Sequence, residues 1–187
     1  MKGKLNFVLG GSRSGKSEFA ERMAERSGKR VTYIATAAVF DEEMAARVKL
    51  HRERRAKDWV TIEEETDVLG VLSTGDKGDV FLLDCATVWL TNLFFYQQRI
   101  APDSALDITE RRILEQVAGL AETINRGLDL IVVSNEIGLG VVPAHHQGRI
   151  LRDLAGKANQ VLAAKADSVY LVVAGIPIEI KSGSQNS

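Results

Sequence analysis

The chain has little of several features that mark particular classes of protein. It contains a single cysteine, Cys85, so an internal disulfide is excluded and a reducing compartment is favoured. Its formal net charge is -1 and its aromatic content is 6%, which speaks against a nucleic-acid groove. No apolar run approaches the roughly 18 residues needed to span a bilayer. We therefore expect a cytoplasmic protein that binds no nucleic acid and does not insert stably into a membrane.

The length and composition point to one globular domain. A chain of 187 residues, 45% hydrophobic and 26% charged, can bury a sizeable core but is short for two domains. We expect a single domain over residues 1–187, in which the small polar tail 182–187 frays.

Apolar runs alternate with helical patterns along most of the chain. "DVFLLDC" is a continuous apolar run, typical of a strand covered on both faces, whereas Phe19, Ala20, Met23 and Ala24 recur at the spacing of one helical stripe. This alternation predicts a mostly parallel sheet flanked by helices on both faces, and the alternating stretch 176–181 predicts a short antiparallel edge strand. The expected strands are 5–10, 30–36, 60–64, 79–85, 129–136 and 168–175, and the expected helices are 16–26, 41–58, 66–72, 86–98, 107–126 and 147–166.

Three polar segments follow expected strands. Residues 10–17 follow the first strand, Asp84 closes the run "VFLLD", and the loop "SNEIGLG" (134–140) ends the run "DLIVVSNE". Ligands of open parallel sheets bind at the carboxyl ends of the strands. We expect these segments to meet at one edge of the sheet and to outline an active site.

The segment "GGSRSGKS", Gly10–Ser17, fits the phosphate-loop pattern G-x-x-x-x-G-K-S, with a strand expected before it and a helix after it. Glycines let backbone N–H groups turn inward around an anion, and the helix N-terminus adds partial positive charge. Lys16 is then expected to reach the terminal phosphates, and the Ser17 hydroxyl to bind Mg²⁺. The sequence therefore predicts an α/β, RecA-like P-loop NTPase domain.

Asp84 is the expected second Mg²⁺ ligand, because it closes the apolar run "VFLLD" in the manner of the carboxylate that lies near the metal in P-loop folds. Capping of the next helix is a compatible second role. Guanine-specific switch proteins would continue as D-x-x-G here and carry N-K-x-D later, but the strands continue as "DCAT" and "SNEI". The choice of base is therefore not readable from that signature.

The three histidines differ in their surroundings. His145 and His146 have no neighbours at metal-ligand spacing. In "HRERR", His51, Arg54 and Arg55 share one face of a helix, which could hold a triphosphate beside a nitrogen nucleophile. A charged helix with one histidine is also typical of a solvated face, and the residues alone leave both interpretations open.

Taken together, the motifs resemble those of the bifunctional adenosylcobinamide kinase/adenosylcobinamide-phosphate guanylyltransferase family of cobalamin biosynthesis. The resemblance runs from Leu5 to about Lys181, and its segments follow one another in the family's order. They are "GGSRSGKS", "YIATA", "DEEMAARV", "HRERR", "LLDCATVWLTNL", "SNEIGLGVVP", "RDLAGKANQ" and "VYLVVAGIP".

The resemblance implies two reactions in one domain. A nucleoside triphosphate, ATP or GTP, phosphorylates the aminopropanol hydroxyl of adenosylcobinamide, and GMP is then transferred from GTP to the product through a GMP-histidine intermediate. The matching histidine is His51, and Lys16 is the second expected catalytic residue. The resemblance also implies a homo-oligomer, specifically a homotrimer, in which the corrinoid cleft lies between subunits.

The family's nucleotide-binding positions carry over residue by residue. Many relatives have proline where this chain has Ala56, and some have a second histidine where it has Leu50; neither departure removes a chemical group that the reactions need. The implied nucleotide-binding residues are Gly10, Gly11, Ser12, Arg13, Ser14, Gly15, Lys16, Ser17, Ile34, Ala35, Thr36, Arg52, Glu53, Arg54, Arg55, Glu63 and Asp84.

Three alternatives remain at this stage. The chain could be a single-activity P-loop kinase of small molecules in which His51 is structural, a RecA-like ATPase that binds nucleic acid, or a nucleotide sensor without activity. The general base of the kinase step is also open, with Asp84 and Glu136 as the candidates.

Overall fold

The computed structural model describes residues 2–37 and 58–183. The predicted helix 41–58, with His51 and Arg52–Arg55, lies almost wholly outside these residues, and so does most of the tail 182–187. The elements, in chain order, are β1 (Leu5–Gly10), α1 (Lys16–Arg26), β2 (Val31–Ala35), β3 (Val60–Glu63), α3 (Val68–Ser73), β4 (Val80–Asp84), α4 (Ala86–Ile100), α5 (Leu106–Glu122), the 3-10 turn η1 (Thr123–Arg126), β5 (Asp129–Asn135), α6 (His146–Lys165), β6 (Ser168–Val173) and β7 (Ile176–Lys181).

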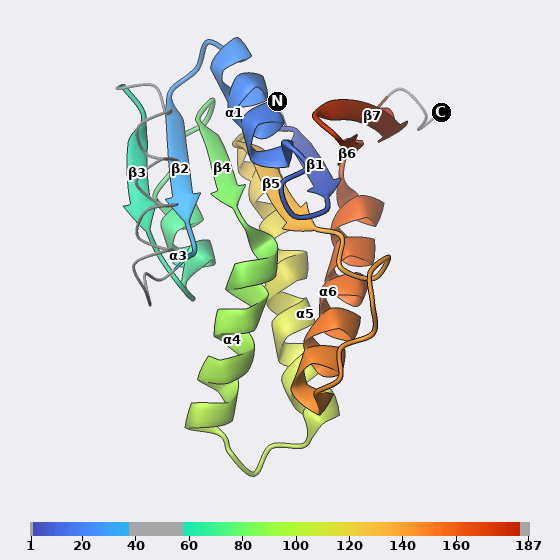
Figure 1. Ribbon diagram of the computed structural model, residues 1–187. Helices are drawn as coiled ribbons and strands as arrows, with labels where there is room; N and C mark the ends of the chain where they lie inside the picture. The colour runs from blue at the N-terminus through green and yellow to red at the C-terminus, as the bar shows by residue number, and fades with distance from the viewer. Residues whose placement is uncertain (1, 38–57, 184–187) are drawn as a thin grey trace.

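The described strands form one seven-stranded sheet in the order β3-β2-β4-β5-β1-β6-β7. Neighbouring strands from β3 to β6 are parallel, and β7 runs antiparallel to β6. Figure 1 shows β7 at one edge of this sheet, with α1 lying across the opposite face from α4, α5 and α6. The predicted α/β class, the mostly parallel sheet and the antiparallel edge strand are confirmed.

Side-chain alternation along the strands divides the core in two. Leu5, Phe7 and Leu9 of β1 point into a larger core against α3, α4, α5 and α6. Val8, from the same strand, points into a smaller core that includes Ala20 and Ala24 of α1. Because both faces are covered, the central strands read as continuous apolar runs rather than as alternating ones. No helix in residues 2–37 and 58–183 is long and apolar enough to cross a membrane.

Several of the predicted boundaries differ from those of the structure by a few residues. The helix expected over 107–126 is α-helical only to Glu122 and tightens into η1, which is followed by the left-handed Gly127 with φ 88. The strand expected to reach 136 ends at Asn135, although Glu136 N still donates to Gly10 O at the end of β1. The strand expected to reach 175 ends at Val173, since residues 174 and 175 adopt positive φ and turn the chain into β7.

An ion pair between Arg30 and Asp79 links the amino ends of β2 and β4. Arg30 precedes β2 and donates to both carboxylate oxygens of Asp79, from Nε at 2.9 Å and from Nη2 at 2.5 Å. Asp79 precedes β4 and is 7% exposed. These hydrogen bonds lower the pKa of Asp79. The pair aligns the two strands whose far ends carry Ala35 and Asp84.

Asp79→Asn is expected to lower Tm at pH 7 by roughly 2–6 °C and to flatten the loss of stability in acid. Because the pKa of Asp79 is lowered on folding from an unfolded value of about 3.9, its contribution is present above that value and is lost as the pH falls through the folded pKa. Thermal unfolding at pH 7 and pH 3 measures this. The gap between wild type and variant should shrink at pH 3, and an unchanged gap would contradict the assignment.

Candidate nucleotide-binding site

The strand register brings the predicted site segments to one edge of the sheet. Gly10 is paired with Asn135, Ala35 with Asp84, and Ala35 with Glu63 on its other side. The carboxyl ends of β3, β2, β4, β5 and β1 therefore form one continuous row. The predicted meeting of the phosphate loop, Asp84 and the "SNE" segment is confirmed.

The phosphate loop joins β1 directly to α1. Gly15, a left-handed residue with φ 89, immediately precedes α1, and no side chain caps the helix. The N–H groups of a first helical turn have no intrahelical partners, so these donors and the helix dipole are available to an anion. Lys16 Nζ donates to Gly11 O at 3.2 Å, so the ammonium lies over the loop's own backbone.

Two neighbouring segments hold this loop in place. Gly175 N, in the turn between β6 and β7, donates to Ser14 O at 2.8 Å, and Glu136 N donates to Gly10 O at 3.0 Å. Ser14 Oγ is buried and has no hydrogen-bond partner among the described residues. The loop is therefore fixed through its backbone while one of its hydroxyls is left without an acceptor.

An added methyl group is expected to destabilise the protein at Gly10 but hardly at Gly11. A Cβ on Gly10 would lie 2.4 Å from Ser14 Oγ and 2.7 Å from Val172 O, whereas a Cβ on Gly11 would meet nothing within 4 Å. Gly10→Ala is expected to cost about 1–3 kcal/mol of stability through overpacking, and Gly11→Ala less than about 0.5 kcal/mol. Urea unfolding without nucleotide checks this pair. Equal losses in the two variants would contradict the packing at Gly10.

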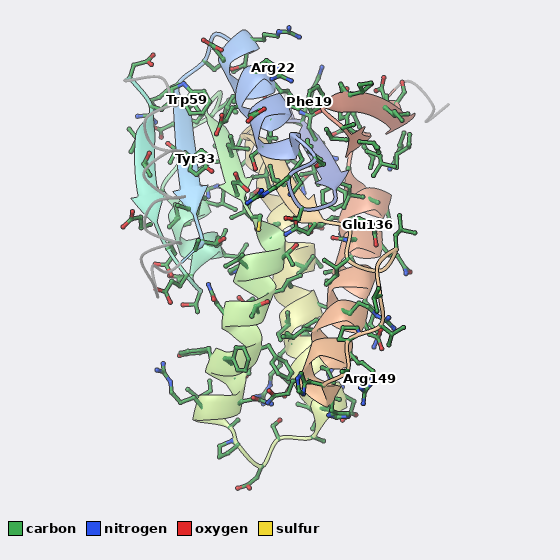
Figure 2. All side chains as sticks on the ribbon, in the orientation of Figure 1. Phe19, Arg22, Tyr33, Trp59, Glu136 and Arg149 are labelled. Atoms are coloured by element: carbon green, nitrogen blue, oxygen red, sulfur yellow. The ribbon has the colours of Figure 1, made fainter. Side chains whose placement is uncertain are left out.

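Asp84 is held at the end of β4 by a tyrosine that the sequence reading missed. Tyr33 OH donates to Asp84 Oδ2 at 2.7 Å, and Tyr33 itself is 2% exposed. Figure 2 shows Tyr33 on β2, beside β4. A tyrosine inside a buried strand needs a partner for its hydroxyl, and that requirement could have signalled the pair. One carboxylate oxygen is thereby fixed, and the carboxylate is only half-buried.

The charges of Lys16 and Asp84 both influence the pKa of the Cys85 thiol. Burial of the thiol, and then the nearby charge of Asp84, raise the pKa of Cys85 to about 12, while the charge of Lys16 opposes the rise. Both charged groups therefore lie close enough to influence this sulfur. A thiol with so high a pKa stays protonated near neutral pH and is no nucleophile.

The predicted residues at the end of β2 are unequally accessible. Ile34 is fully buried in the larger core. Thr36 is also fully buried, and its hydroxyl donates to Cys85 O at 2.9 Å and accepts from Cys85 N at 3.0 Å. Ala35 remains partly exposed. A nucleotide can therefore meet this segment through Ala35 and the backbone, not through the side chains of Ile34 or Thr36.

Glu63 lies at the far end of the row. It is exposed at the end of β3, and β2, β4 and β5 separate β3 from β1. At about 4.8 Å per strand, roughly 19 Å lies between Glu63 and the strand that carries the phosphate loop. Only a ligand extended along the sheet edge can contact both, so Glu63 belongs to the part of the site away from the terminal phosphates.

A buried polar network, which sequence reasoning also missed, fixes the end of β5. Ser134 Oγ donates to Asn159 Oδ1 of α6 at 2.8 Å, and Thr87 Oγ1 of α4 lies 3.1 Å from Ser134 Oγ. Asn135 N donates to Thr87 Oγ1 at 2.8 Å, and Asn159 Nδ2 donates to Asn135 O at 3.2 Å. An asparagine inside the apolar stripe of α6 was the available signal, because a buried amide requires partners. The network ties α4 and α6 to the strand beside the phosphate loop.

Together, the parallel sheet, the phosphate loop between β1 and α1 and the carboxylate at the end of β4 define a P-loop nucleotide-binding protein. Within that class the family is known. Residues 6–180 match the family described as cobinamide kinase / cobinamide phosphate guanyltransferase, and the chain belongs to it.

Two relatives cover almost the whole chain. The bifunctional adenosylcobalamin biosynthesis protein CobP of Pseudomonas aeruginosa is 41% identical over 177 residues, which are 94% of this chain and 96% of the relative. The bifunctional adenosylcobalamin biosynthesis protein CobU of Escherichia coli strain K12 is 40% identical over 179 residues, 93% of this chain and 98% of the relative.

A solved structure supports the fold alone. The ATP synthase subunit NeqB of Nanoarcheaum equitans superposes with a TM-score of 0.55 at 10% sequence identity, covering 91% of this chain and 46% of that one.

Proposed function

We propose that this protein phosphorylates the aminopropanol hydroxyl of adenosylcobinamide with ATP or GTP, and then transfers GMP from GTP to the phosphate it has made. The product is adenosylcobinamide-GDP, and diphosphate leaves. The observation that carries the proposal is an uncapped phosphate loop in a chain whose family and relatives are bifunctional over nearly their full length. This favours two activities over the single-activity kinase.

In the kinase step the phosphate loop binds the transferred phosphoryl group. The N–H groups at the start of α1 bind the phosphate oxygens, and Lys16 exchanges its contact with Gly11 O for the terminal phosphates. Ser14 Oγ, buried without a partner in this loop, fits an added acceptor oxygen. Since the transition state carries its charge on the phosphoryl oxygens, these donors stabilise it and position the reactants.

The residues around the loop fit a bound Mg²⁺. Ser17 supplies a hydroxyl and Asp84 a carboxylate, both hard oxygen donors of the kind Mg²⁺ prefers, and Tyr33 fixes one oxygen of Asp84. When bound, the ion neutralises charge on the phosphates. Tyr33 and the phosphate loop then keep its two protein ligands in place.

In the guanylyl step His51 is the nucleophile. Neutral imidazole attacks the α-phosphorus of GTP, the bond to the diphosphate breaks, and a GMP-histidine forms. The phosphate of the corrinoid then attacks the same phosphorus and releases His51. Arg52, Arg54 and Arg55 neutralise the departing charge. His51 and these arginines lie outside the described residues, and the family resemblance supports their roles.

The remaining nucleotide contacts extend along the same sheet edge. Ala35 at the end of β2 is partly exposed and Glu63 at the end of β3 is exposed. Both can therefore contact a nucleotide that extends from the phosphate loop toward β3. The proposed contacts are Gly10, Gly11, Ser12, Arg13, Ser14, Gly15, Lys16, Ser17, Ile34, Ala35, Thr36, Arg52, Glu53, Arg54, Arg55, Glu63 and Asp84.

The same proposal includes the organisation of the protein: one domain over residues 1–187, in the cytoplasm, assembled as a homo-oligomer and specifically a homotrimer. The outer strand β7 supports self-association, because Ile176, Ile178 and Ile180 are 66%, 49% and 57% exposed on an edge that has no further strand among the described residues. Apolar edge strands of this kind are commonly covered by another chain.

A single-turnover assay tests the proposed function. Enzyme in excess over adenosylcobinamide is mixed with ATP or GTP and the corrinoid products are separated. The phosphate should accumulate first, and adenosylcobinamide-GDP should follow only when GTP is present. Accumulation of the phosphate alone with GTP would indicate the single-activity kinase, and no corrinoid product would refute the proposal.

A further inference from the structure

A second carboxylate lies beside the phosphate loop. Glu136 directly follows β5, the strand between β1, which leads into the loop, and β4, which ends at Asp84. Neighbouring strands are about 4.8 Å apart, so the end of β5 lies roughly 5 Å from each of those two strands. Glu136 N donates to Gly10 O at 3.0 Å, and Figure 2 shows Glu136 near the loop and far from Arg149 in the first turn of α6.

The Glu136 side chain is oriented by its own turn. Its Oε1 accepts from Gly138 N at 2.7 Å. A Cβ on Gly138 would come within 2.9 Å of that oxygen, so the glycine leaves room for the carboxylate. The second oxygen, Oε2, has no hydrogen-bond partner within the described part of the chain, and the residue is half-buried. One oxygen is therefore anchored while the other can accept a proton.

The strand end that carries Glu136 is rigidly supported. Ser134 is fully buried and is bonded to Asn159, while Asn135 is bonded to Thr87. These contacts fix the two preceding residues against α6 and α4. A catalytic group must be held within about 0.5 Å of its working position, and this support meets that need.

The other carboxylates on this sheet edge suit proton transfer less well. Asp84 accepts a hydrogen bond from Tyr33 and is a proposed Mg²⁺ ligand, so both of these interactions occupy its oxygens. Glu63 ends β3, roughly 19 Å from the strand leading into the phosphate loop. Glu136 follows the strand that separates β1 from β4, and its N–H is bonded to the start of the phosphate loop, so a terminal phosphate bound at the loop would lie near it.

We propose that Glu136 is the general base of the kinase step; this rests on the proposed function. The carboxylate takes the proton from the corrinoid hydroxyl as the hydroxyl oxygen forms a bond to the γ-phosphorus. The bond between that phosphorus and the bridging oxygen breaks, and the nucleoside diphosphate leaves with the electron pair. Glu136 then releases its proton to solvent. Guanylyl transfer needs no such base, because its nucleophiles are an imidazole and a phosphate.

Glu136→Gln tests the assignment, because the amide keeps the shape and still accepts from Gly138 N but cannot take the proton. We expect kcat for adenosylcobinamide phosphorylation to fall about 10²-fold, with little change in KM for the triphosphate and loss of the acidic limb of the pH profile. Labelling of the enzyme by GTP, and GMP transfer to ready-made adenosylcobinamide phosphate, should stay within about two-fold of wild type. Glu115→Gln, an exposed glutamate of α5, is the matched control and should change neither activity.

The outcomes separate this inference from the proposed function. A kinase rate within a few-fold of wild type, or an equal fall in both activities, would overturn the role of Glu136. Retained labelling by GTP shows that the variant is folded and binds nucleotide. A wild-type enzyme that phosphorylates no corrinoid would instead refute the proposed function, before any variant is compared.

Discussion

Lys16→Met is expected to reduce both activities by about 10²- to 10³-fold, because in the proposed mechanism one phosphate loop serves both nucleotide reactions. In the structure Lys16 Nζ lies over Gly11 O, and its charge reaches Cys85 beside Asp84. Methionine keeps the length and apolar stem of the side chain but removes the positive charge that the phosphates require. Phosphorylation of adenosylcobinamide and covalent labelling by GTP are measured on the same preparation.

Lys77→Met is the matched control, since Lys77 is exposed in the turn before β4 and away from the carboxyl edge of the sheet. It should leave both rates unchanged. A Lys16→Met enzyme that lost phosphorylation but kept labelling by GTP would show that the two reactions use different phosphate sites.

His51→Ala is expected to separate the two activities. Removal of the proposed nucleophile should lower GMP transfer by roughly 10³-fold or more, whereas phosphorylation should stay within a few-fold of wild type, because the proposed phosphate and Mg²⁺ ligands Lys16, Ser17 and Asp84 remain. The two steps are assayed separately, with adenosylcobinamide and with its ready-made phosphate. His145→Ala, at the exposed start of α6, is the control. Equal rates of GMP transfer in wild type and His51→Ala would assign the transfer to another residue.

The parts of the site that sequence predicts are local. The phosphate loop is a contiguous motif, and its glycines and flanking elements indicate its conformation. The strands before Asp84 and the "SNE" segment are recognisable as continuous apolar runs because both of their faces are buried. Parallel pairing then brings the carboxyl ends of these strands to one edge of the sheet, and this does not depend on the exact register between them. For these reasons the architecture and the meeting of the three segments are predictable from one chain.

The parts that sequence does not predict depend on side chains brought together by register. Tyr33 meets Asp84 only because β2 pairs with β4, with Ala35 opposite Asp84. Asn159 meets Ser134 only because α6 packs against β5. Neither pair has a characteristic spacing along the chain. Motif matching also cannot distinguish the buried Ile34 from the accessible Ala35, because a motif specifies which residue stands at each position but not how exposed its side chain is.

The measurement that tests the central claim most directly is covalent labelling with GTP that carries its label in the α-phosphate. We expect a label on the wild-type chain that is stable to alkali and lost in acid, as a phosphoramidate is, and that mass spectrometry places at His51. The label should be absent from His51→Ala, and adenosylcobinamide phosphate should remove it from wild type as adenosylcobinamide-GDP forms. GMP transfer by a wild-type enzyme that never carries the label would contradict the account.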